Sequence, residues 1–96
     1  MQNITFQPHK LGQVCQRYDV SKLCLFGSMA RDEATAKSDL DLLVYFSKRK
    51  SLLTLVELEW QLRRIFKRKV DLLTEGSLSP YIRTQVLREA KVIYEA

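Results

Sequence analysis

The stretch from Leu23 to Phe46 (LCLFGSMARDEATAKSDLDLLVYF) constrains the fold more than any other part of the chain. It opens with an apolar run typical of a buried strand, which Gly27-Ser28 interrupts as a turn. A short helix is predicted to begin directly after this turn, at Met29. Free backbone N–H groups at a helix start, together with the positive end of the helix dipole, favour an anion such as phosphate. The turn therefore predicts a phosphate site.

The same stretch ends in a second predicted strand that contains two acidic residues, Asp39 and Asp41. Alternate side chains of a strand project from one face, so these carboxylates are expected together, with their Cα atoms roughly 6 to 7 Å apart. Two carboxylates so placed are suited to Mg²⁺. The plainer interpretation is a solvated strand face. Leu43 and Tyr45 argue against it, because they continue the same face.

The rest of the chain alternates between helix and strand. Apolar spacing predicts a helix from Pro8 to Tyr18, and Ser51 is suited to cap a longer helix that runs to about Lys67. A third strand, Lys69–Thr74, contains Asp71, and a closing helix is predicted from Pro80 to about Glu95. We expect an α/β (α+β) fold in which a small mixed sheet of about three strands is backed by helices, as one domain over residues 1–96.

Three aspartates thus fall on predicted strands, namely Asp39, Asp41 and Asp71. A charged residue in an apolar strand is costly unless it is paired, exposed or bound to metal. For Asp71 alone, an ion pair with one of the nearby basic residues is a strong alternative. Other catalytic patterns fit less well. The chain has neither the Gly-Lys-Ser/Thr of a P-loop nor the G-x-S-x-G of a nucleophile elbow, and His9 is its only histidine.

Length and composition limit the possible functions. A chain of 96 residues forms one core but has no room for a separate substrate domain, so a function that needs two lobes needs a partner. Cys15 and Cys24 lack metal-site spacing and are expected to be buried, reduced thiols. We find neither a signal peptide at the N-terminus nor an apolar run of about 18 residues, so a cytoplasmic location without membrane contact is expected.

The net charge of +5 is concentrated in two basic runs, one at residues 48–50 and one within residues 63–69. Such runs suit a polyanionic ligand or an acidic protein surface. Solvated helix ends explain them equally well, because cations near a helix C-terminus complement its dipole. No motif for dedicated nucleic-acid binding is present, so direct nucleic-acid binding is not expected.

The glycine and aspartate motifs together resemble a family signature. Gly27-Ser28, Ala30-Arg31 and the segment 38–44 (SDLDLLV), with Asp71 on a later strand, are similar to the G-S-x-A-R…S-D-x-D-L-L-V signature of the minimal nucleotidyltransferases. These belong to the polymerase-beta-like nucleotidyltransferase superfamily. The resemblance covers nearly the whole chain, including the closing S-P-Y-I-R…L-R-E-A-x-x-I-Y-E segment. A D-x-D pair alone would be far less specific.

The resemblance implies a Mg²⁺-dependent enzyme that transfers AMP from ATP. Carried over by position, Gly27 and Ser28 contact the nucleotide phosphates, while Asp39 and Asp41 bind two metal ions. Asp71 is the third carboxylate, placed to ligate the metal on the acceptor side and to accept a proton from the attacking hydroxyl.

Two nearby residues modify this expectation. Arg31, one helical turn from the phosphate site, either neutralises phosphate charge or pairs with an acidic neighbour such as Asp32, and both interpretations stay open. Asp32 itself stands where many relatives have glycine. Its carboxylate adds negative charge close to the expected triphosphate.

Family members are typically encoded beside a small, all-helical protein of the HEPN class. The resemblance therefore implies a prokaryotic toxin–antitoxin pair in which the nucleotidyltransferase is the antitoxin and a tyrosine of the HEPN toxin receives AMP. A hetero-oligomer with this partner, or self-association, is expected. Two alternatives stay open: a non-catalytic antitoxin that occludes a helical partner, and nucleotidyl transfer to a small molecule or RNA.

Overall fold

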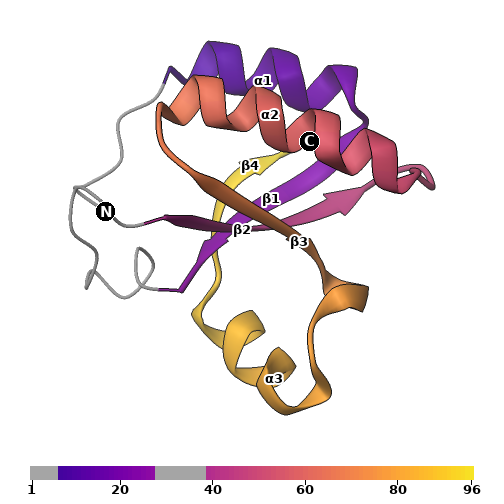
Figure 1. Cartoon of the computed structure of the whole chain (residues 1–96), viewed down its shortest axis with the longest axis vertical. Coiled ribbons are helices and arrows are strands. Elements are labelled where there is room, and N and C mark those ends of the chain that lie inside the picture. The colour runs from indigo at the N-terminus through magenta and orange to yellow at the C-terminus, as the bar shows by residue number, and fades with distance from the viewer. Residues whose placement is uncertain (1–6, 28–38) are drawn as a thin grey trace.

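A computed structural model describes the chain over residues 7–27 and 39–96 (Figure 1). Within these ranges the chain forms helices around one mixed sheet, which confirms the predicted fold class. The elements are α1 (Pro8–Arg17), β1 (Val20–Phe26), β2 (Leu40–Phe46), α2 (Leu52–Phe66), β3 (Val70–Thr74), the 3-10 turn η1 (Glu75–Ser77), α3 (Pro80–Glu89) and β4 (Lys91–Glu95). The helix predicted from Met29 lies outside the described residues.

The helices α1 and α2 begin and end close to where the sequence predicts. Pro8 stands in the first turn of α1, where its missing N–H costs no hydrogen bond. Ser51 caps α2, because its Oγ accepts a hydrogen bond from the backbone N–H of Thr54 at 3.2 Å. Lys67 ends this helix in a left-handed conformation with φ 56°. No helix in the described ranges is long and apolar enough to cross a membrane.

The sheet has the strand order β3-β2-β1-β4. β1 is antiparallel to both β2 and β4, whereas β2 and β3 are parallel. A parallel pair requires a crossover connection, and α2 provides it. The starts of β2 and β3 therefore lie side by side, and the end of β1 meets them there because Phe26 is paired with Asp41.

The predicted closing helix is wrong over its last part. α3 ends at Glu89, and Ala90 has an extended conformation with φ −62° and ψ 135°. Residues 91–95 form β4 on the outer edge of β1, which makes a four-stranded sheet where about three strands were predicted. The β-branched and aromatic side chains of KVIYE favour a strand, and the open edge of β1 supplies its hydrogen-bonding partners.

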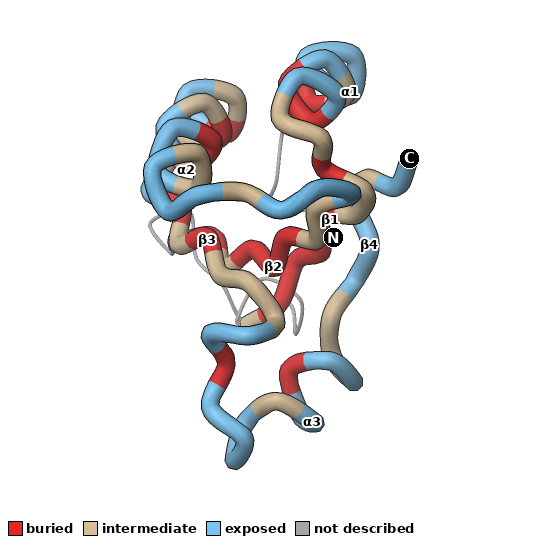
Figure 2. The backbone as a smooth tube through the Cα atoms, turned by 90° about the vertical axis from the view of Figure 1, so that its right-hand side faces the viewer, coloured by how far each residue is buried: buried red, intermediate tan, exposed pale blue. Residues whose placement is uncertain are grey.

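The two faces of the sheet are covered unequally (Figure 2). We call the face under α1 and α2 the helix face, and the opposite face, where α3 lies, the acid face. Buried sheet residues of the helix face include Leu23, Leu25, Leu40, Leu42, Val44, Val70 and Leu72. Those of the acid face are Cys24, Phe26 and Leu43, which pack with Leu78 and with Val86 of α3.

Both cysteines are buried and free, as predicted. Burial raises the pKa of the Cys15 thiol to about 12, and it also raises the pKa of Cys24. Both thiols therefore stay protonated near neutral pH, where the thiolate would be the reactive form.

Candidate active site

Two of the predicted site residues are direct neighbours in the sheet. Asp41 of β2 and Asp71 of β3 are Cα partners in the parallel register. The strand residues that flank them, such as Leu40 and Leu72, are buried on the helix face, so both aspartates project from the acid face. Each is half-buried. Because neighbouring strands lie about 4.8 Å apart, the two aspartate side chains extend from Cα atoms on adjacent strands and lie next to each other.

Gly27, directly after the end of β1, lies against the Asp41 side chain of this site. It follows Phe26, the Cα partner of Asp41, and has a φ of 76°, a conformation that L side chains rarely adopt. A Cβ atom added at Gly27 would collide with the Asp41 carboxylate. The glycine is therefore required twice, once by its own backbone and once by the side chain that lies against it.

Asp39 lies apart from this pair. It immediately precedes β2 and is exposed, and its Oδ2 is 3.8 Å from the Nζ of Lys69, the residue that immediately precedes β3. The ion pair forms because the parallel register aligns the two strand starts. Within residues 7–27 and 39–96, no three His, Cys, Asp or Glu side chains are grouped as a metal site. The structure thus brings Asp41 to Asp71, and it directs Asp39 to a lysine.

Two further predicted site residues, Ser28 and Arg31, lie outside the described residues. The turn that precedes them is described up to Gly27, which stands beside Asp41. The sequence did not predict the role of Lys69 as the ion-pair partner of Asp39. Its position in a basic run was visible, but the pairing depends on the register between two strands that are far apart in the chain.

The paired aspartates fit a hard divalent cation. Carboxylate oxygens are the ligands that Mg²⁺ prefers, and two of them project from adjacent positions on one face. Two like charges side by side disfavour each other unless a cation compensates them. The half-exposed position of Asp41 and Asp71 leaves such an ion, and the phosphates that accompany it, a route from solvent.

Comparison with known proteins identifies the class of this chain. Residues 9–96 match the family described as Polymerase beta, Nucleotidyltransferase. The chain therefore belongs to this family and is a nucleotidyltransferase. This confirms the family to which the sequence motifs were similar.

Two relatives place the chain more closely within the family. A protein of Methanocaldococcus jannaschii, named as a candidate protein adenylyltransferase, is 38% identical over 88 residues, which cover 92% of this chain and 95% of the relative. The protein adenylyltransferase MntA of Thermococcus cleftensis is 42% identical over 79 residues, which cover 82% of this chain and 78% of the relative.

Solved structures have the same fold. A candidate minimal nucleotidyltransferase is 39% identical with a TM-score of 0.74, covering 88% of this chain and 86% of its own. A chain of a toxin–antitoxin complex with AMP-PNP gives a TM-score of 0.75 at 22% identity, and the match covers 94% of this chain and 74% of that chain. A chain of the complex between tri-AMPylated Shewanella oneidensis HEPN toxin and MNT antitoxin gives a TM-score of 0.66 at 21% identity. The match covers 93% of this chain and 70% of that chain. At these identities the two complexes show a shared fold alone.

Proposed function

We propose that this chain is a Mg²⁺-dependent protein adenylyltransferase that transfers AMP from ATP to a tyrosine of a HEPN toxin, and that it thereby acts as an antitoxin. The observation that carries the proposal is the register pairing of Asp41 with Asp71 beside Gly27. Relatives named protein adenylyltransferase support the reaction. The AMPylated HEPN toxin found with an MNT antitoxin of the same fold supports the partner and the chemistry.

The proposed metal ligands are Asp39, Asp41 and Asp71. The last two already project together from the acid face, and Asp39 joins them once its side chain leaves Lys69. That ion pair is exposed, and exposed pairs are worth little free energy, so a bound cation readily replaces it. When bound, Mg²⁺ stabilises the phosphate charge and promotes deprotonation of the attacking hydroxyl.

The transfer exchanges one bond at phosphorus for another. The phenol oxygen of the acceptor tyrosine attacks the α-phosphorus of ATP, the bond to the bridging oxygen breaks, and pyrophosphate leaves. We assign the phenol proton to the carboxylate of Asp71. The backbone N–H groups after Gly27, with Ser28 Oγ, hold the β- and γ-phosphates, and Arg31 neutralises their charge.

The proposal is tested with the chain and its co-purified HEPN partner, incubated with ATP and Mg²⁺. We expect the intact mass of the partner to increase by one or more AMP units, and a partner Tyr→Phe variant should locate the acceptor. The double change Asp39→Asn, Asp41→Asn should abolish the increase, because it removes two proposed ligands. Lys69→Gln is the matched control, since it frees Asp39 and leaves every carboxylate in place. It should retain the transfer.

A second candidate is an antitoxin that neutralises its partner by binding alone, because only two of the three proposed ligands, Asp41 and Asp71, are paired in the described structure. The same double variant separates the two candidates in cells. If it protects cells from the toxin as well as wild type does, occlusion is the mechanism. If protection is lost while the purified complex persists, the transfer reaction is the mechanism.

A further inference from the structure

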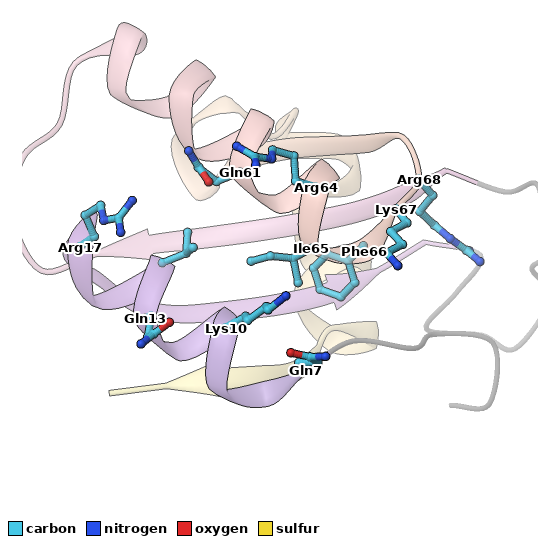
Figure 3. A pocket seen from close by; sticks show the side chains of 11 residues that line it. Gln7, Lys10, Gln13, Arg17, Gln61, Arg64, Ile65, Phe66, Lys67 and Arg68 are labelled. Atoms are coloured by element: carbon cyan, nitrogen blue, oxygen red, sulfur yellow. The ribbon is translucent and has the colours of Figure 1, made fainter.

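Figure 3 shows a cleft between α1 and α2. These helices cover the helix face, so the cleft lies on the opposite side of the sheet from Asp41 and Asp71. Its volume is about 670 Å³, which is within the range of small-molecule sites. Buried Val14 and Phe66, with Ile65, form its apolar lining. The proposed transfer reaction makes no use of this cleft.

The charge of the cleft has a single sign. Among the described residues, five cationic side chains line it, namely Lys10, Arg17, Arg64, Lys67 and Arg68, and no Asp or Glu does. In the described part of the chain, the first four of these make no ion pair with a carboxylate. Gathered cations repel one another and raise the local positive potential, and a bound anion relieves both.

The arrangement of the cations indicates an elongated ligand. Figure 3 shows Arg17 at one end of the cleft, Lys67 and Arg68 at the other, and Lys10 between them. Residues 10 to 17 of α1 alone span about 10 Å along the helix axis. The glutamines of the lining, Gln7, Gln13 and Gln61, add amide donors along this length. A ligand with negative charge distributed along a line satisfies more of these donors than a single compact anion.

The lining favours phosphate over the other linear anions. Single-stranded nucleic acid is held largely by bases that stack on exposed aromatic rings. Phe66, the one aromatic residue among the described lining residues, is 5% exposed and presents no such surface. An acidic peptide also carries backbone N–H donors that need acceptors, and the polar side chains among the described lining residues are cations and amides, which mainly donate.

We propose that this cleft binds the linear phosphate chain of a small polyphosphorylated anion, at a site separate from that of the proposed transfer. The ligand is recognised through its phosphates, so inorganic tripolyphosphate and a nucleoside triphosphate both fit. The site does not depend on Asp41, on Asp71 or on a divalent metal ion.

The test uses sodium tripolyphosphate, titrated into the full chain by calorimetry in excess EDTA, which prevents any metal-dependent binding at the aspartates. We expect saturable binding of one tripolyphosphate per protein molecule, with an affinity that weakens as the salt concentration is raised. Arg17→Gln with Arg64→Gln should weaken it at least about tenfold, because two charge-assisted contacts are lost. Lys48→Gln with Arg49→Gln removes the same charge from an exposed loop and should change the affinity less than about twofold. Each double variant alters only exposed side chains.

Several results would overturn the proposal. Absence of binding would do so, as would equal weakening by the two double variants, which would reduce the effect to net charge. Stronger binding in Asp41→Asn, through loss of a repelling carboxylate, would place the phosphate chain at the aspartates instead. Binding of single-stranded RNA or an acidic peptide without competition from tripolyphosphate would assign the cleft to another partner. Metal-free ATP competing with tripolyphosphate supports recognition of the phosphate chain, whereas failure to compete contradicts it.

Discussion

The two faces of the sheet differ in what they bury and in what they leave accessible. Among the described residues, the helix face belongs to a cluster of 14 buried residues from the sheet, α1 and α2, whereas the acid face contributes to a cluster of five. The half-buried Asp41 and Asp71 lie on the less covered face. A second full helix layer there would desolvate both carboxylates, which is costly. In the described part of the chain, the helix face therefore buries the larger apolar cluster, and the two half-buried carboxylates lie on the face with the smaller one.

The largest expected effect is the loss of AMP transfer in Asp41→Asn. Replacing a proposed metal ligand should lower the rate of partner AMPylation by at least about 1,000-fold, because the metal acts on every reacting group. Folding stability should stay within about 1 kcal/mol of wild type, because asparagine keeps the volume of this half-buried side chain. Incorporation of labelled AMP and urea unfolding measure the two quantities. A stable variant with undiminished transfer would remove Asp41 from the reaction.

The next effect tests the other face. Leu62 of α2 is fully buried on the helix face, and Leu62→Ala should lower the free energy of unfolding by about 2–5 kcal/mol. Val86→Ala, in the smaller cluster of the acid face, should cost about 1–2 kcal/mol, because fewer atoms are removed from a less covered site. Urea denaturation of both variants checks the difference. Equal losses would mean that the two faces contribute alike.

A smaller effect on folding stability is expected at Gly27, directly after the end of β1. Gly27→Ala should destabilise the chain by about 1–3 kcal/mol, since alanine at φ 76° is strained and its Cβ would displace the Asp41 carboxylate. Gly76→Ala is the matched control, because no atom lies within 4 Å of its added Cβ. Thermal unfolding and ATP affinity with Mg²⁺ should both respond at Gly27 and stay near wild type at Gly76. An equal response at both glycines would contradict the close packing against Asp41.

The sequence predicted the elements whose signals are local. The cap at Ser51 and the apolar spacing of α2 and β3 were sufficient to place those elements within a residue or two. The closing strand was missed because Ile82, Val86 and Ile93 also fit a helical spacing. Nothing local shows that the edge of β1 is open to residues 91–95, since that opening is a property of the assembled sheet.

The same limit applies to the candidate site. The strand alternation indicated that Asp41 projects with Leu43 and Tyr45, and these two residues do share the acid face. Asp39 and Asp41 were predicted to share a metal site with Asp71 as the third carboxylate, and the described structure shows that Asp41 and Asp71 are register partners on adjacent strands. Register between strands separated by a helix is set by tertiary packing, so no local pattern reveals it. The roles of Gly27, Ser28, Arg31 and the three aspartates stay predictions.

The smallest effect concerns Tyr45, at the margin of the acid face. Burial, followed by a hydrogen bond to the Glu75 carboxylate, raises the pKa of Tyr45 to about 12. An unfolded tyrosine has a pKa near 10, so the folded protein holds this proton more tightly. The resulting stability is fully present below pH 10 and is lost as the pH rises from 10 to 12. Urea unfolding across this range should therefore show a shallower decline for Tyr45→Phe than for wild type. Tyr81→Phe, at a position 95% exposed, should follow the wild-type decline. Parallel curves for wild type and Tyr45→Phe would show that folding does not raise the pKa of Tyr45. Burial at the margin of the acid face would then be too slight to affect this side chain.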